Sequence, residues 1–144
     1  MSNEEIELIQ DLSGIIGNNP RAIKRFVNVY QIVRAHAGLN FKKGNQYQVY
    51  LVLMFLLALP IGPFNKIHRL FVDSINNDDN HGLTLYHFIQ SSLKIKDNDM
   101  KNMVHKLDVL LSDKETFKSL QKTLLSDFNY HNVFIQRFTF TDIK

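Results

Sequence analysis

Three cations crowd the start of one predicted helix, and they are the residues of this chain best suited to bind an anion. Asn19 followed by Pro20 predicts a helix start, and Arg21, Lys24 and Arg25 come directly after it. The helix macrodipole already makes this end positive, so each cation costs roughly 0.3–1 kcal/mol there. The arrangement becomes favourable when a phosphate or carboxylate docks against free backbone amides and the arginine side chains.

The charge distribution extends this basic character beyond one helix. The chain has 144 residues, with 17 Lys and Arg against 14 Asp and Glu, a formal net charge of +3. Between residues 12 and 72 no acid offsets the cations Arg21, Lys24, Arg25, Arg34, Lys42, Lys43, Lys66 and Arg69. One half of the molecule is therefore set up to face anions. Two alternatives remain open: chance clustering on a solvated surface, or neutralisation by acids such as Asp73 or Asp78 that fold back onto the cations.

Most catalytic and cofactor motifs are missing from the sequence. It has no Walker A loop, no G-x-G-x-x-G, no G-x-S-x-G and no H-E-x-x-H. The sequence has 0 Cys, so it can form neither a disulfide nor a thiolate nucleophile. The six His never pair at helical spacing, and Asn76–Gly82 lacks the spacing of an EF-hand, so we expect no metal and no cofactor bound by this chain alone. We interpret His68 as a hydrogen-bonded structural histidine.

Two helices are predicted in the N-terminal quarter. Ser2 with Glu5 makes a capping box, and Gly17 ends the helical stretch that follows it. The cationic helix should then run to about Ala37, with Gly38 as its stop. Its stripe of Arg21, Arg25 and Asn28 is separate from the predicted buried face, which consists of Ala22, Ile23, Phe26, Val29, Tyr30 and Val33.

A nearly all-apolar segment follows a polar, basic loop at Leu39–Gln46. Gln46–Leu59 predicts the central helix of a bundle, and Pro60–Pro63 should break it. The apolar run is shorter than the ~20 residues that span a bilayer, so no membrane span is expected. With no signal peptide visible at the N-terminus, we expect a cytoplasmic protein.

The remaining sequence predicts shorter helices and one terminal exception. Ser112 with Glu115 should cap the last helix, which carries Phe117, Leu120 and Leu124. From Phe134 to Phe140 the pattern alternates with a period of two, which suits a short C-terminal strand. The predicted helices before these are Phe64–Ile75, Leu83–Leu93 and Met100–Leu111. The fold class is therefore all-α, a bundle of about six to seven helices in a single domain spanning residues 1–144.

The segment from Gly17 to Tyr30 resembles the N-P-R-x-[IV]-K-R-[FL]-x-N-x-[YF] helix that lies downstream of the ATPase core in KAP-type P-loop NTPases. These bacterial proteins are related to the AAA and STAND ATPases. The apolar helix around Leu53–Leu57 with the Pro60–Pro63 break resembles the next part of that region. The closing Arg137–Phe140 is similar to its R-[FY]-S-F ending, with Thr in place of Ser.

This resemblance implies a helical lid or regulatory module rather than a complete enzyme. In AAA-type relatives the arginine that starts the equivalent helix is the sensor-2 residue, which reaches the terminal phosphate of ATP; here that role falls on Arg21. Lys24 and Arg25 would make auxiliary phosphate or inter-subunit contacts. The partner would be a P-loop ATPase core, in the same polypeptide or a neighbouring subunit, that binds ATP and Mg²⁺. Because this chain lacks Walker A and Walker B motifs, we expect no ATP hydrolysis by it alone.

Two other functions fit the same residues. The basic half could lie along the phosphate backbone of a nucleic acid, although base-reading and stacking signatures are absent. The bundle could equally be a helical protein-interaction module, which needs no chemistry of its own.

Overall fold

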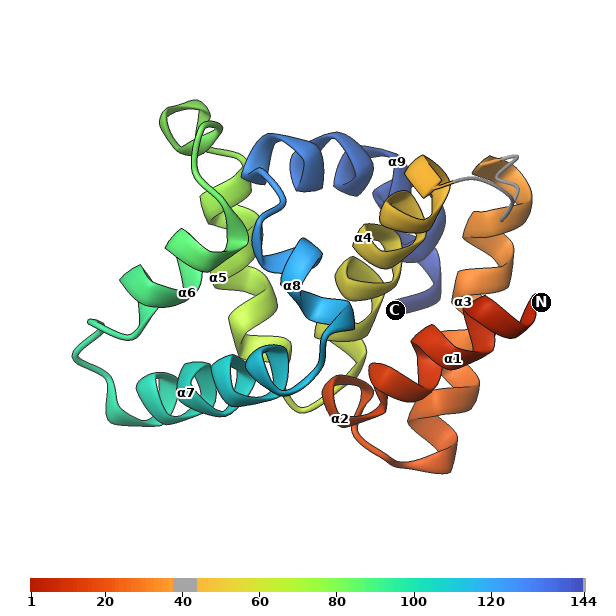
Figure 1. Cartoon of the computed structure of the whole chain (residues 1–144), viewed down its shortest axis with the longest axis horizontal. Helices are drawn as coiled ribbons and strands as arrows, with labels where there is room; N and C mark the ends of the chain where they lie inside the picture. The colour runs from red at the N-terminus through yellow and green to blue at the C-terminus, as the bar shows by residue number, and fades with distance from the viewer. Residues whose placement is uncertain (38–43, 144) are drawn as a thin grey trace.

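The computed structural model describes residues 1–37 and 44–143, with the side chains of residues 1–36 and 47–137. The predicted all-α class is confirmed: within these ranges the chain forms nine α-helices and one 3₁₀ helix, and no strand (Figure 1). The helices are α1 Asn3–Asp11, α2 Ser13–Ile16, α3 Pro20–Ala37, α4 Gly44–Ile61, α5 Asn65–Ile75, η1 Asp78–Asn80, α6 Leu85–Ser92, α7 Asn98–Asp113, α8 Thr116–Gln121 and α9 Leu125–Ile143.

The N-terminal helices form as their caps predict. The Ser2 hydroxyl accepts from the Glu5 amide at 3.2 Å, and the Glu5 carboxylate accepts from the Ser2 amide at 2.9 Å, which completes the capping box. The first helical stretch divides into α1 and α2, and Gly17 ends α2 with φ +118°. Helix α3 begins at Pro20, as predicted, while the expected stop at Gly38 lies outside the described residues.

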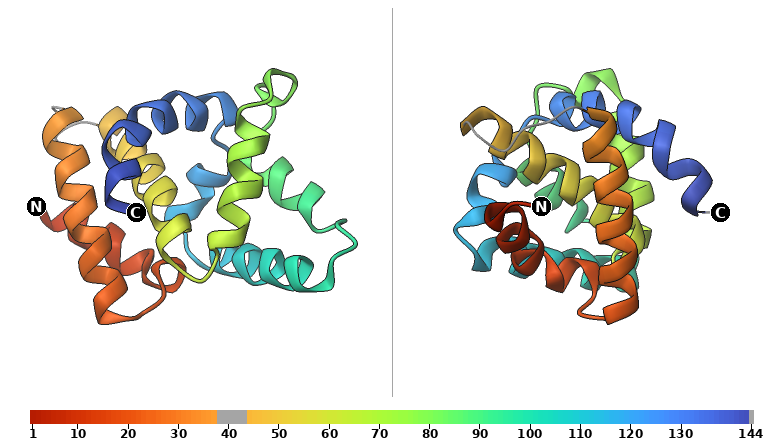
Figure 2. Two further views of the ribbon diagram at one scale, coloured as in Figure 1. Left: turned by 180° about the vertical axis from the view of Figure 1, so that it is seen from behind. Right: turned by 90° about the vertical axis from the view of Figure 1, so that its right-hand side faces the viewer.

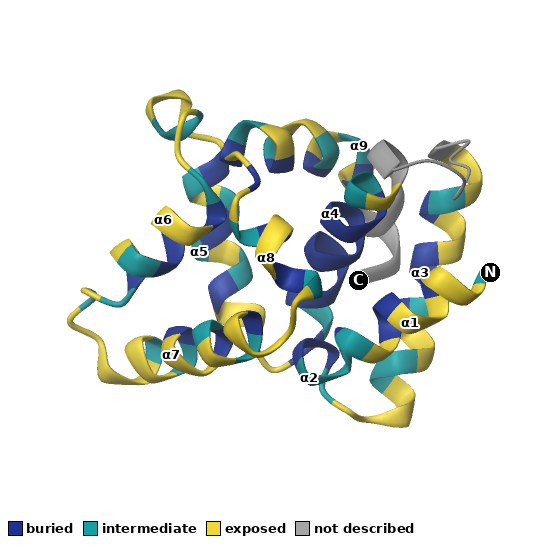
Figure 3. Cartoon of the chain, in the orientation of Figure 1, coloured by how far each residue is buried: buried dark blue, intermediate teal, exposed yellow. Residues whose placement is uncertain are grey.

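Helix α4 is the centre of the core. Every side chain from Tyr50 to Leu59 is buried, because other helices pack around α4 on all sides (Figures 1 and 3). The helix begins at Gly44 rather than Gln46, so the end of the predicted Leu39–Gln46 loop is helical, and the rest of that loop lies outside the described residues. The predicted break at Pro60–Pro63 is confirmed: within this segment α4 continues through Pro60 to Ile61 and ends before Gly62.

The predicted face of α5 is confirmed and joins an aromatic cluster at the middle of the molecule. Phe71 lies 5.9 Å from Phe55 of α4, 5.1 Å from Phe128 of α9 and 5.0 Å from Phe88 of α6, measured between ring centroids. Each pair is close to edge-to-face, the arrangement that aromatic quadrupoles favour. Four helices are therefore joined through one side chain.

The C-terminal part differs most from the predictions. Ser112 lies inside α7 rather than capping α8, and α8 starts after Glu115 with no side-chain cap. Leu124 is exposed and lies outside α8, where it forms an isolated antiparallel bridge with Thr84.

The segment predicted as a C-terminal strand belongs to helix α9 instead. The buried residues Leu125, Phe128, Asn132 and Ile135 recur at helical spacing, so a helix buries this face and an extended chain would not. Figure 2 shows α9 running over α4 and then turning down beside α3.

Within the part of the chain that the structure describes, every helix is too short or too polar to cross a membrane.

Candidate anion site on helix α3

The three predicted anion-binding side chains lie together on the exposed face of α3. Arg21, Lys24 and Arg25 line a shallow groove of about 330 Å³ with Asn28 at the next turn. The predicted stripe is thus present, and Val29 and Ile32 complete the groove wall. The opposite face of α3 is anchored in the core by Phe26, Tyr30 and Val33, which are fully buried. The cations are therefore exposed on a helix whose rotation is fixed by packing.

No carboxylate among the described residues pairs with these three cations. Asp73 and Asp78, the acids considered as neutralising partners, do not contact them, and the Asp78 carboxylate lies 3.8 Å from His81 instead. The cost of placing cations at a helix start is accordingly not offset by any described acid. An incoming anion would reduce that cost.

The backbone at the start of α3 offers fewer donors than expected. Pro20 has no N–H, the Arg21 amide donates to the Asn19 side-chain oxygen at 2.9 Å, and the Ile23 amide donates to the Asn19 carbonyl at 2.9 Å. In this first turn only the Ala22 amide is left without a bond to a described residue. The expectation of several free amides is wrong, because the Asn19 cap occupies one of them. Anion binding here depends mainly on side chains.

Arg34, a fourth cation of the basic half, is held by a buried acid. Its Nε lies 2.7 Å from the Glu5 carboxylate, whose side chain is 0% exposed, while the Arg34 side chain is 33% exposed. The same carboxylate accepts from the Tyr30 hydroxyl at 2.6 Å. The sequence indicated Glu5 only as a capping residue and Tyr30 only as core. A signal was present, since Tyr30 and Arg34 are one turn apart on the same helix and an acid can bond both.

The bonds to Glu5 set its ionisation. Burial alone would raise the pKa of Glu5, but the hydrogen bonds from Tyr30 and Ser2 and the positive charge of Arg34 outweigh it and hold that pKa below its ordinary value. Burial and the bond to Glu5 raise the pKa of Tyr30, which keeps its hydroxyl protonated as the donor. The side chains of Glu5, Tyr30 and Arg34 therefore hold α1 against α3 and do not form a vacant binding site.

The remaining cations of the basic half do not join the α3 groove. Lys66 and Arg69 line a separate depression of about 570 Å³ beside His68, and Lys42 and Lys43 lie outside the described residues. His68 is half-buried, and burial lowers its pKa. Its ring makes no hydrogen bond to any described residue, contrary to the prediction of a hydrogen-bonded histidine.

In the acidic and amide-rich loop between α5 and α6, the side chains form hydrogen bonds with nearby backbone groups. The Asn77 side chain accepts from the Asp79 amide at 3.0 Å, the Asn80 side chain donates to the Ser74 carbonyl at 3.1 Å, and His81 lies 3.0 Å from the Ile75 carbonyl. Among the described side chains, those of residues 1–36 and 47–137, no group of three or more His, Asp or Glu is placed to hold a metal ion.

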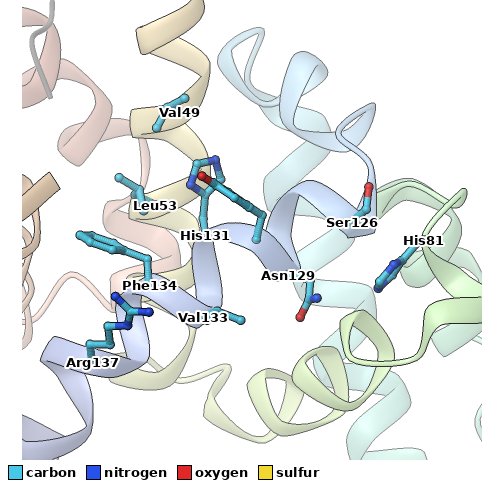
Figure 4. A pocket seen from close by; sticks show the side chains of 10 residues that line it. Val49, Leu53, His81, Ser126, Asn129, His131, Val133, Phe134 and Arg137 are labelled. Carbon is cyan, nitrogen blue, oxygen red and sulfur yellow. The ribbon is translucent and has the colours of Figure 1, made fainter.

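A larger hollow, of about 800 Å³, lies where α9 bends past α4 and the end of η1 (Figure 4). It is lined by Val49, Leu53, His81, Ser126, Asn129, Tyr130, His131, Val133, Phe134 and Arg137. The sequence could not indicate it, because the lining comes from three distant segments and the end of one of them, from Phe134 on, was predicted as a strand. Burial lowers the pKa of His131, an effect that the charge of Asp127 partly offsets.

Comparison of the chain with protein-family models, with curated proteins and with solved structures gave no match.

Proposed function

We propose that this chain is a helical lid or regulatory module of a P-loop ATPase, in which Arg21 contacts the phosphates of ATP bound by a separate core. The observation that carries the proposal is the position of Arg21: exposed, at the first turn of a helix anchored in the core, and lining a groove with two further cations and no described counter-ion. The core would belong to the same polypeptide or to a neighbouring cytoplasmic subunit, and would supply the ATP and Mg²⁺ site.

The side chains suit a polyphosphate. A guanidinium presents planar paired donors that match two phosphate oxygens, and it stays protonated at any relevant pH. From Arg21 to Arg25 the helix rises by roughly 6 Å, one helical turn, so the two side chains lie on the same face and can reach one polyphosphate together. Lys24 and Arg25 would therefore make auxiliary contacts while Arg21, closest to the helix start, reaches the terminal phosphate. The position of α3, which moves as a rigid helix, would then depend on whether that phosphate is present.

The first test uses the chain by itself with inorganic tripolyphosphate, measured by isothermal titration calorimetry. Arg21→Ala should weaken binding about tenfold, the loss expected for one charge-assisted contact of about 1.4 kcal/mol. Arg69→Ala is the matched control, because it removes the same charge from a separate depression. Equal losses in the two variants would mean that net charge alone drives binding, and would overturn the assignment to α3.

The second part of the same test needs the ATPase core. If the reading frame upstream encodes a Walker A motif, the joined protein should hydrolyse ATP, and Arg21→Ala should lower kcat while leaving ATP binding largely intact. A hydrolysis rate unchanged by Arg21→Ala would count decisively against a sensor role. An upstream frame without a Walker A motif would favour a freestanding interaction module.

A further inference from the structure

We infer that the hollow at the bend of α9 binds a small anion with an apolar body, an aromatic or aliphatic carboxylate or its sulfonate counterpart. The hollow is distinct from the α3 groove, and no residue lines both. The inference therefore does not depend on the proposed ATPase role.

The size and walls of the hollow suit a ligand rather than solvent alone. Its volume of about 800 Å³ lies within the range of small-molecule sites, roughly 300–1,000 Å³. Val49 and Leu53 of α4 and Phe134 of α9 give it an apolar wall along one end (Figure 4). A few polar groups converge on the same space, which is the usual composition of a binding pocket.

The charge of the lining selects an anion. Arg137 stands at the apolar end, near Phe134 (Figure 4), and no Asp or Glu is among the described lining residues. Asp127, whose charge acts on His131, lines the adjacent depression instead. Arg137 forms no ion pair with a described carboxylate. A carboxylate on this guanidinium would place the apolar body of the ligand against Leu53 and Phe134.

Two exposed apolar side chains on α9 are further evidence for a ligand, because a bound molecule would cover them. Val133 is 52% exposed and Tyr130 76% exposed, and both border the hollow. Large apolar side chains grouped at the edge of a concave surface are typical of binding sites. A ligand body in the hollow would remove part of this apolar surface from water and gain free energy from doing so.

The test uses anilinonaphthalene sulfonate, an aromatic anion whose fluorescence rises on binding, with decanoate and acetate as competitors. We expect the dye to bind the folded chain, decanoate to displace it and acetate not to do so. Arg137→Gln should weaken dye and decanoate binding about tenfold. Val133→Glu should weaken them at least as much, because it sets an anion at the rim. Circular dichroism confirms that each variant is folded.

Matched controls separate this site from general surface effects. Val109→Glu places the same charge at a residue of α7 that is 54% exposed and does not line the hollow, and it should leave affinity unchanged. Arg21→Gln removes an arginine from the α3 groove and should also have no effect. The inference is overturned if Val109→Glu weakens binding as much as Val133→Glu. It is overturned equally if phenylnaphthylamine, the dye without its sulfonate, binds as tightly and Arg137→Gln changes nothing, or if no dye binds.

Discussion

Glu5 is a charged residue in the interior of the molecule. Its carboxylate is fully buried, accepts hydrogen bonds from Ser2 and Tyr30, and forms an ion pair with Arg34, so one side chain caps α1 and ties it to α3. A buried carboxylate is tolerated only when its oxygens are satisfied in this way. Arg34, which is partly exposed, is thus held in an ion pair with Glu5. The cations of α3 that can contact a ligand are the ones nearer the start of that helix.

The ionisation of Glu5 predicts a specific pH dependence of stability. Because its pKa is lower in the folded protein than the ordinary value of 4.5, the folded state favours the ionised form. This contribution is present in full above that value and is lost as the pH falls through the folded pKa. At pH 7 we expect Glu5→Gln to lower the free energy of unfolding by about 2–3 kcal/mol, measured by urea denaturation.

The difference between wild type and Glu5→Gln should therefore shrink steadily below about pH 4.5. Glu4→Gln is the matched control, since Glu4 is exposed on the same helix and its replacement should change the free energy of unfolding by no more than about 0.5 kcal/mol. A Glu5→Gln difference that stayed constant from pH 7 to pH 2.5, or one no larger than that of Glu4→Gln, would contradict the role of the charged network.

At the scale of elements, Gly62 marks a close approach between two parts of the backbone. It follows the end of α4, and a Cβ atom at this position would lie 2.0 Å from the Ile15 carbonyl oxygen and 2.9 Å from that of Ile16. The turn after α4 is thus pressed against the end of α2, next to Gly17 and the start of the cationic helix. The segment that leads from α2 into α3 therefore packs closely against the turn after α4.

Replacing Gly62 with Ala should therefore disturb the molecule far more than its size suggests. Since backbone atoms cannot yield as side-chain ends do, we expect a loss of about 3 kcal/mol or more in the free energy of unfolding. Gly82→Ala is the matched control, because a Cβ at Gly82 meets nothing within 4 Å. Thermal unfolding of both variants measures the effect, and equal melting temperatures would contradict the close packing at Gly62.

The elements predicted well from sequence are those with strong periodicity and clear caps. Helix α1 formed from its capping box, α3 from Asn19 and Pro20, and α5 from its apolar stripe. The failures share a physical cause, which is that packing overrode local propensity. Aromatic and β-branched residues favour a strand after Phe134, yet the core accepts the buried face of α9 only as a helix. The break predicted at Pro60–Pro63 is not one of these failures, since α4 ends within that segment, after Ile61.

The two candidate sites differ in how far the sequence could reveal them. The α3 groove is built from neighbouring turns of one helix, so helical spacing alone placed Arg21, Arg25 and Asn28 together. The hollow at α9 combines Val49, His81 and Arg137, which only the tertiary fold brings to one place. The Glu5–Arg34 pair lies between these two cases in how predictable it was. The sequence singled out each residue, but it did not predict that the two would be in contact.

On the scale of the whole molecule, the distribution of charge limits what duplex DNA could gain. The sequence offers eight cations without an acid between residues 12 and 72, but Arg34 is held by Glu5, and Lys66 and Arg69 line a depression apart from the α3 groove. Arg21, Lys24 and Arg25 can neutralise about three phosphates. The logarithm of the binding constant should then fall against the logarithm of salt concentration with a slope of about −3.

Between 50 and 200 mM salt such a slope reduces affinity only roughly 60-fold from a weak starting value, so we expect non-specific binding without sequence preference. Fluorescence anisotropy with two unrelated duplexes over a salt series measures this. Neutralising Arg21, Lys24 and Arg25 together with Gln should abolish the slope, whereas Lys66→Gln with Arg69→Gln should leave most of it. A slope steeper than about −5 that both sets of variants reduce equally would indicate a continuous nucleic-acid surface, because only phosphates spread along a duplex can engage cations from separate helices at once.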